Sequence, residues 1–176
     1  MLMERFFTSI EKAIGADDFY GALSTALTIP DIAGKLESPD AGVGARYKEW
    51  YRTWLQATYT GTGHAVGGHV FLSDEDCYGL RCSYLHAGGG ELEHKAKHTL
   101  ERFHFIERPK WGSAHRIQNN GVLLLQVDIF CLEMVEAGRR WFKWARENRP
   151  DIVQRMDSLL IIHNADKGIP GLVHFE

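Results

Sequence analysis

The chain has 176 residues, of which 44% are hydrophobic and 24% are charged, and its formal net charge is −3. This length and balance are typical of one globular unit, so we expect a single domain over residues 1–176. The composition excludes long disorder and a membrane-resident chain, and the charge excludes the broad basic surface that holds long nucleic acid by counterion release.

The sequence carries no sign of export. Glu4 and Glu11 interrupt the apolar N-terminal pattern, which therefore lacks the order of a secretory signal, and no stretch reaches the length of a membrane-spanning helix. Cys77, Cys82 and Cys131 have no paired spacing, which favours reduced thiols in the core over disulfides. We therefore expect a cytoplasmic protein that has no membrane partner.

Helical periodicity predicts the elements of the first third of the chain. Apolar residues recur at helical spacing over residues 2–14. Asp17 or Asp18 can cap a second helix, which Pro30 should break before a short helix over residues 30–36. The sequence thus predicts two helices and a short third one in this region.

A turn over residues 38–44 should precede a helix over residues 45–58 that carries a wide aromatic face. Rings at strict helical spacing favour a buried face, although they could instead stack on bases. The residues of this face are Tyr47, Trp50, Tyr51 and Trp54.

The next predicted helix begins at a capping signal. Ser73 and Asp76 resemble a capping box, and the acidic first turn suits the positive end of the helix dipole. The helix then runs through YGLRCSYLH towards three glycines at residues 88–90, where a helix would end or fray.

The remaining elements include the only predicted strands. Residues 103–107, FHFIE, suit a short strand, and residues 121–127, GVLLLQV, suit either its partner or the start of a helix. Apolar residues then recur at alternating steps of four and three, which predicts the buried seam of a long helix that ends at Pro150. A last helix should follow over residues 151–162. The expected fold class is mainly α: a helical bundle with a small β-hairpin inserted before the long helix.

The segment RCSYLH, from Arg81 to His86, resembles the R-x4-6-H motif of the HEPN superfamily. Members of that family are compact helical bundles that commonly dimerise, and many are metal-independent RNases. The family motif lies late in a core helix and often has a glycine after the histidine. Here the glycine, Gly88, comes two residues after His86. Cys82 departs from the Asn, Asp or His that the family prefers after the arginine.

Helix geometry does not bring Arg81 and His86 together by itself. At about 100° per residue, their Cβ directions differ by about 140°. The side chains would converge if Arg81 extends towards the C-terminal end, if the helix frays at residues 87–90, or if a second subunit supplies the partner.

The resemblance implies specific roles for this pair. His86 would act as general base or acid on the 2′-hydroxyl or the leaving 5′-oxygen, and Arg81 would stabilise the charge of the transition state. It also implies an RNA substrate, a homodimer, no cofactor and no metal, and a toxin or phage-defence role with an inhibitory partner protein.

Basic residues close to the motif suit phosphate. Lys95, Lys97 and His94 are the candidate RNA contacts. His94 and His98 also stand at the i, i+4 spacing of zinc ligands, but no third ligand is evident in the sequence, so we expect no metal site.

A non-catalytic interpretation competes with the RNase. In it, Arg81 and His86 organise the interface of a dimeric binding or regulatory module, or bind a nucleotide or a partner. An arginine late in a bundle helix also commonly caps carbonyls or pairs with an acid such as Asp76 or Glu75.

Overall fold

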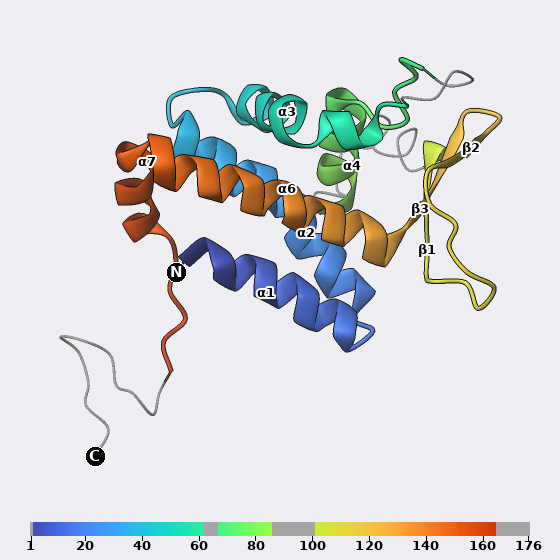
Figure 1. The fold of residues 1–176 in the computed structure, drawn as a ribbon, viewed down its shortest axis with the longest axis horizontal. Helices are drawn as coiled ribbons and strands as arrows, with labels where there is room; N and C mark the ends of the chain where they lie inside the picture. Colours follow the sequence, from blue (N-terminus) through green and yellow to red (C-terminus); the bar gives the residue numbers. More distant parts are fainter. Residues whose placement is uncertain (1, 62–66, 86–100, 165–176) are drawn as a thin grey trace.

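The computed structural model describes residues 2–61, 67–85 and 101–164. Figure 1 shows α6 crossing the middle of the molecule, with α1 on one side and α3 on the other. The helix α2 contacts α1, α3 and α6, and α4 packs on α3 and α2. The bounds of these helices are Leu2–Gly15 for α1, Phe19–Glu37 for α2, Val43–Trp54 for α3, Asp74–Leu85 for α4 and Val127–Asn148 for α6.

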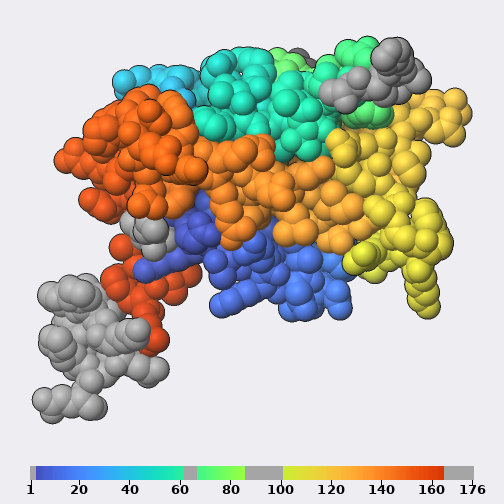
Figure 2. Space-filling view, in the orientation of Figure 1, coloured from blue at the N-terminus to red at the C-terminus, as the bar shows by residue number. Residues whose placement is uncertain are grey.

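The long helix α6 supplies the centre of the core. Its seam is buried as the spacing predicted, at Val127, Phe130, Met134, Ala137 and Trp141. Figure 2 shows the surface of α6 between those of α3 and α1, with the strands at one end. The bundle prediction is therefore confirmed, and none of the helices within the described ranges is long and apolar enough to span a membrane.

The aromatic face of α3 belongs to the core. Tyr47, Trp50 and Tyr51 are at most 2% exposed. Trp54 is partly buried and packs on Trp144 of α6, with ring centroids 5.5 Å apart. Base stacking on Tyr47, Trp50 and Tyr51 is excluded because the bundle buries these rings. The helix α3 ends at Trp54, earlier than the predicted end at residue 58, and is followed by a 3₁₀ turn, η1 (Gln56–Tyr59).

The expected break at Pro30 is wrong. Asp18 caps α2 by accepting a 2.9 Å hydrogen bond from the Gly21 amide, and the helix then runs without interruption to Glu37. A proline inside a helix costs about 3 kcal/mol. Pro30 and its neighbour Ile29 are buried, and burying one large apolar side chain contributes about 1.5–3 kcal/mol. Several such side chains on α2 outweigh the lost hydrogen bond.

The start of α4 confirms the capping box. The Asp76 amide donates to Ser73 Oγ at 3.1 Å, and the Ser73 amide donates to Asp76 Oδ2 at 3.3 Å. Two of the backbone donors at the N-terminus of α4 are thereby satisfied, which fixes where α4 begins and hence the position of the residues further along it.

The strands form a three-stranded sheet in the order β1-β3-β2. They are β1 (Phe103–Ile106), β2 (Ile117–Asn119) and β3 (Val122–Gln126). A tight turn with positive φ at Asn120 and Gly121 joins β2 and β3 into a hairpin. The strand β2 was not predicted, since the expected hairpin joined residues 103–107 to residues 121–127. Residues 122–126 are thus a strand and not the start of α6. They do pair with β1, but the two strands run parallel. The chain after β1 first forms β2 on the far edge of the sheet and then turns back as β3 between the two.

The predicted last helix is shorter than expected. The helix α7 (Pro150–Arg155) passes into a 3₁₀ turn, η2 (Met156–Ser158), and residues 159–164 are not helical. Ile152 and Met156 reach the core, but Leu160 is 85% exposed. Since so little of the Leu160 side chain is buried, periodicity alone does not sustain a helix to residue 162.

Candidate functional site

Arg81 lies on the second half of α4 and faces α2. Its Nε donates a 2.7 Å hydrogen bond to Oδ2 of Asp31, and the two side chains are only 15% and 16% exposed. Asp31 follows the buried Pro30, so the uninterrupted course of α2 is what places the carboxylate opposite α4. The structure therefore gives Arg81 a partner 50 residues away in sequence.

The terminal nitrogens of Arg81, Nη1 and Nη2, make weaker hydrogen bonds than Nε or none within the described ranges. Nη1 lies 3.9 Å from Cys82 Sγ, and sulfur is a weak acceptor. Nη2 makes no hydrogen bond to any residue in the described ranges. An arginine held at Nε with its terminal edge free can bind two oxygens of one phosphate.

Besides its partner Asp31, Arg81 has the phenols of Tyr47 and Tyr78 near it, and the Cys77 thiol lies next to Tyr47. Tyr78 packs on Tyr47 with centroids 5.4 Å apart, and the Tyr47 hydroxyl lies 3.5 Å from Cys77 Sγ. Burial raises the pKa of Tyr47, and burial together with the Cys82 thiol raises the pKa of Tyr78. Burial likewise raises the pKa of Cys77 to about 12. At neutral pH these groups are protonated, so they add no negative charge around Arg81.

The expected pairing of Arg81 with an acid is present, but the acid is Asp31 and neither of the two that the sequence suggested as examples. Asp76 closes the capping box and lies 3.4 Å from Arg102, and Glu75 pairs with Lys48 at 2.6 Å. Both acids sit in the first turn of α4, whereas Arg81 projects from the helix one to two turns later and towards α2.

Of the residues that the sequence singled out for chemistry, only Arg81 falls within the described ranges. His86, the proposed proton-transfer residue, and the candidate RNA contacts His94, Lys95 and Lys97 all lie outside them, as does His98. Their roles stay predictions.

Asp31 was missed by the sequence reasoning, although a signal was present. It is a lone acid within TALTIPDIAGKL, where the surrounding residues are apolar or small. An acid on an otherwise apolar helix needs a buried partner, because an unpaired carboxylate is costly to desolvate. The sequence could have flagged Asp31 in this way, but it could not have identified Arg81 as the partner.

A second polar cluster joins the sheet to the bundle. Glu133 on α6 accepts a 2.6 Å hydrogen bond from the Tyr59 hydroxyl and lies 3.1 Å from His115 Nε2. His115 Nδ1 accepts the Gln126 amide at 3.1 Å, so Nε2 carries the proton that Glu133 accepts. Both imidazole nitrogens are occupied and the side chain is 6% exposed. His115 therefore fastens the hairpin to α6 and has no free nitrogen to offer a substrate.

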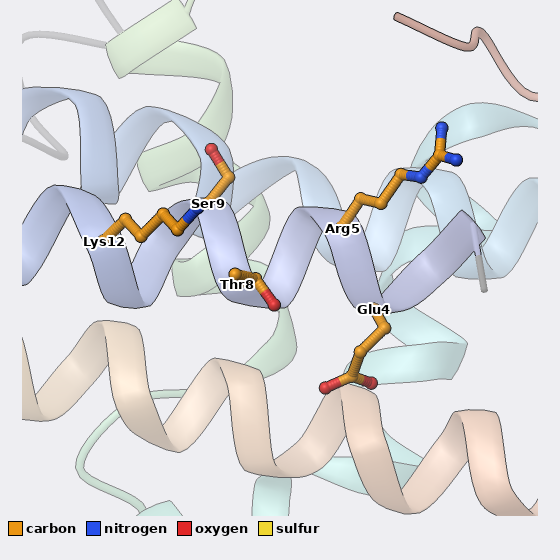
Figure 3. A pocket seen from close by; sticks show the side chains of 5 residues that line it. All are labelled: Glu4, Arg5, Thr8, Ser9 and Lys12. Atoms are coloured by element: carbon orange, nitrogen blue, oxygen red, sulfur yellow. The ribbon is translucent and has the colours of Figure 1, made fainter. Parts of the chain in front are cut away.

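A shallow groove runs along α1 and is lined by Glu4, Arg5, Thr8, Ser9 and Lys12. In Figure 3, Glu4 points towards α6, while Arg5 and Ser9 point the other way. Arg139 of α6 binds Glu4 at 2.8 Å. Within the described ranges, all lining side chains come from one helix and none is buried, so the groove offers no enclosed site.

Within residues 2–61, 67–85 and 101–164, no three histidine, cysteine, aspartate or glutamate side chains are grouped as metal ligands. Comparisons of the chain with protein-family models, with curated proteins and with solved structures gave no match.

Proposed function

We propose that this protein is a metal-independent endoribonuclease of the HEPN type, with Arg81 and His86 as its catalytic residues. The observation that supports this most is the state of the Arg81 guanidinium. It is held at Nε by Asp31, and among the described residues its terminal edge has no acceptor stronger than sulfur. A cation oriented in this way suits the charge that develops on a phosphorane.

The proposed reaction needs no group beyond RNA and the protein. The ribose 2′-oxygen attacks the adjacent phosphorus while His86, or its copy in a second subunit, removes the 2′-proton. The bond from phosphorus to the 5′-oxygen breaks, and a protonated histidine returns a proton to that oxygen. The products are a 2′,3′-cyclic phosphate and a 5′-hydroxyl, and Arg81 stabilises the additional negative charge on the non-bridging oxygens between these two steps.

The wider setting of this function follows the resemblance to the HEPN superfamily. The proposal includes a cytoplasmic homodimer in which two copies of the Arg81 and His86 pair meet across a two-fold axis. Lys95, Lys97 and His94 would contact RNA phosphates. An inhibitory partner protein would restrain the activity, as in toxin–antitoxin or phage-defence systems.

A non-catalytic binding or regulatory module is the second candidate. It is favoured by the pairing of Arg81 with an acid and by the small exposed fraction of its side chain, 15%. A guanidinium whose charge is compensated within the bundle can serve as a structural link between α2 and α4.

Incubation of the purified protein with a mixed RNA pool in EDTA tests the first candidate against the second. The wild type should release fragments that end in 2′,3′-cyclic phosphate, whereas His86→Ala and Arg81→Ala should each lower the rate by at least about 10²-fold. Glu75→Gln, which alters an exposed ion pair on the same helix, should retain the wild-type rate. Equal cleavage by all four proteins would indicate a contaminant, and no cleavage by any would favour the binding module.

A further inference from the structure

We propose that Asp31 is a positioning residue that orients Arg81, so that the Nη1 and Nη2 edge of the guanidinium meets the scissile phosphate. This inference rests on the proposed function and adds a third residue to its site. Asp31 does not touch the substrate in this arrangement. It acts only through Arg81.

The guanidinium has more than one edge that can bind an acceptor, and Asp31 selects between them. By accepting from Nε alone, Oδ2 of Asp31 leaves both terminal nitrogens to another acceptor. The contact of Nη1 with Cys82 Sγ, at 3.9 Å, is weak enough for a phosphate oxygen to replace it. The pairing therefore blocks one edge and presents the other.

The carboxylate is itself well fixed. Asp31 is 16% exposed on a helix whose neighbouring Ile29 and Pro30 are buried, so its backbone is held by the core of the bundle. Its second oxygen, Oδ1, is buried and has no hydrogen-bond partner among the residues that the structure describes. A buried carboxylate oxygen without a donor carries a cost that a merely structural ion pair would usually avoid through bidentate pairing.

The positive charge of Arg81 explains why the residue that orients it should be an acid such as Asp31. Without Asp31, the long Arg81 side chain could turn its terminal nitrogens to the neighbouring sulfur or to backbone carbonyls, as arginines near helix ends commonly do. A carboxylate binds Nε more strongly than these neutral acceptors. Loss of Asp31 should thus leave the charge in place and remove its orientation, an effect that appears in kcat more than in KM.

A double-mutant cycle on the cleavage rate tests this assignment. Asp31→Ala should lower kcat about 10-fold to 100-fold with little change in KM, and Asp31→Asn, which keeps an acceptor oxygen, should lower it less. In the Arg81→Ala background, Asp31→Ala should cause no further loss, because the residue on which it acts is gone. Glu75→Gln in both backgrounds is the matched control, because it removes another paired acid, one of α4 that binds Lys48 of α3.

A spectroscopic readout separates orientation from stability. The Arg81 Nε proton, held in a 2.7 Å hydrogen bond, should give a slowly exchanging NMR signal that disappears in Asp31→Ala. Circular dichroism should show that the helices of the variant remain folded at the assay temperature.

The outcomes distinguish this inference from the proposed function. If the wild type cleaves and Asp31→Ala reduces kcat by the same factor with and without Arg81, the positioning role is overturned while the RNase stands. If the wild type cleaves no RNA, the RNase fails and the positioning role fails with it. Loss of the Nε signal together with a non-additive cycle would establish Asp31 as the positioner.

Discussion

The hydroxyl of Tyr59 donates a 2.6 Å hydrogen bond to Glu133 Oε2, although the two residues are 74 positions apart. Tyr59 is fully buried, and the Glu133 side chain is 14% exposed. Burial and the neighbouring Glu133 carboxylate raise the pKa of the Tyr59 phenol, which therefore stays protonated and remains a donor. This bond ties the turn after α3 to the long helix at the end of the bundle that carries the sheet.

We expect Tyr59→Phe to lower the free energy of unfolding by about 1–3 kcal/mol, because Glu133 loses a donor in a largely desolvated position. Urea denaturation followed by circular dichroism would measure the change. Tyr20→Phe is the matched control, since the Tyr20 side chain is 80% exposed, and it should change the free energy by less than about 0.5 kcal/mol. Equal effects of the two substitutions would contradict the role assigned to the buried bond.

A close approach of α2 and α3 gives a second prediction. A Cβ atom added at Gly34 would lie 2.9 Å from the backbone oxygen of Arg46, so α3 would have to move. Gly34→Ala should therefore destabilise the protein by about 1–3 kcal/mol. At Gly15, an added Cβ would have no atom within 4 Å other than those of the adjoining backbone. Gly15→Ala should therefore leave stability unchanged or raise it by up to about 1 kcal/mol. Thermal unfolding of both variants checks the contrast, and an unchanged midpoint for Gly34→Ala would refute it.

Arg139 makes the packing of α1 on α6 dependent on pH. Its Nη1 and Nη2 donate to the two oxygens of Glu11 at 2.6 and 3.0 Å. These hydrogen bonds hold the pKa of Glu11 below its usual value. A lowered carboxyl pKa contributes stability that is fully present above the unfolded pKa, about 4.3, and is lost as the pH falls through the folded pKa.

Removal of the guanidinium should remove this contribution. Arg139→Met should lower the free energy of unfolding by about 0.5 kcal/mol at pH 7, since the pair is more than one-third exposed, and by less at pH 3. Urea denaturation at the two pH values measures the difference. Arg140→Met, which removes a neighbouring cation that bonds a backbone carbonyl, should lack this dependence on Glu11. A loss that is larger at pH 3 than at pH 7 would contradict the assigned sign.

The three cysteines should differ in reactivity. Cys77 and Cys131 are buried, and burial raises the pKa of each to about 12, whereas Cys82 is partly exposed. Iodoacetamide at pH 8 should therefore alkylate Cys82 first, and the other two only after denaturation. Peptide mass spectrometry would identify the modified sites. Rapid labelling of Cys77 in the folded protein would be inconsistent with the packing of α4 on α3.

The sequence predicted the elements whose signals are local. Helical periodicity found α1 and α6, the aromatic spacing found the buried face of α3, and Ser73 with Asp76 marked the start of α4. Each of these signals depends on residues within one or two turns of one another, which is why they can be read without knowledge of the fold.

Errors arose where tertiary contacts decided the outcome. The local effect of proline predicted a helix break at Pro30, but α2 continues through it because this part of the helix is buried. Periodicity predicted that the last helix extends to residue 162, but Leu160 is exposed and gains too little burial to continue it. The pattern of residues 121–127 suited either strand or helix, and pairing with β1 and β2 made residues 122–126 a strand.

The candidate site divides in the same way. The sequence alone determined a mainly α bundle and directed attention to Arg81, because the residue types and spacing of RCSYLH are visible in the chain. Only the tertiary structure paired Arg81 with Asp31 across 50 residues, and only it joined Tyr59, His115 and Glu133. The physical reason is that charge pairing and desolvation depend on which helix faces meet, and that is decided by the packing of the whole core.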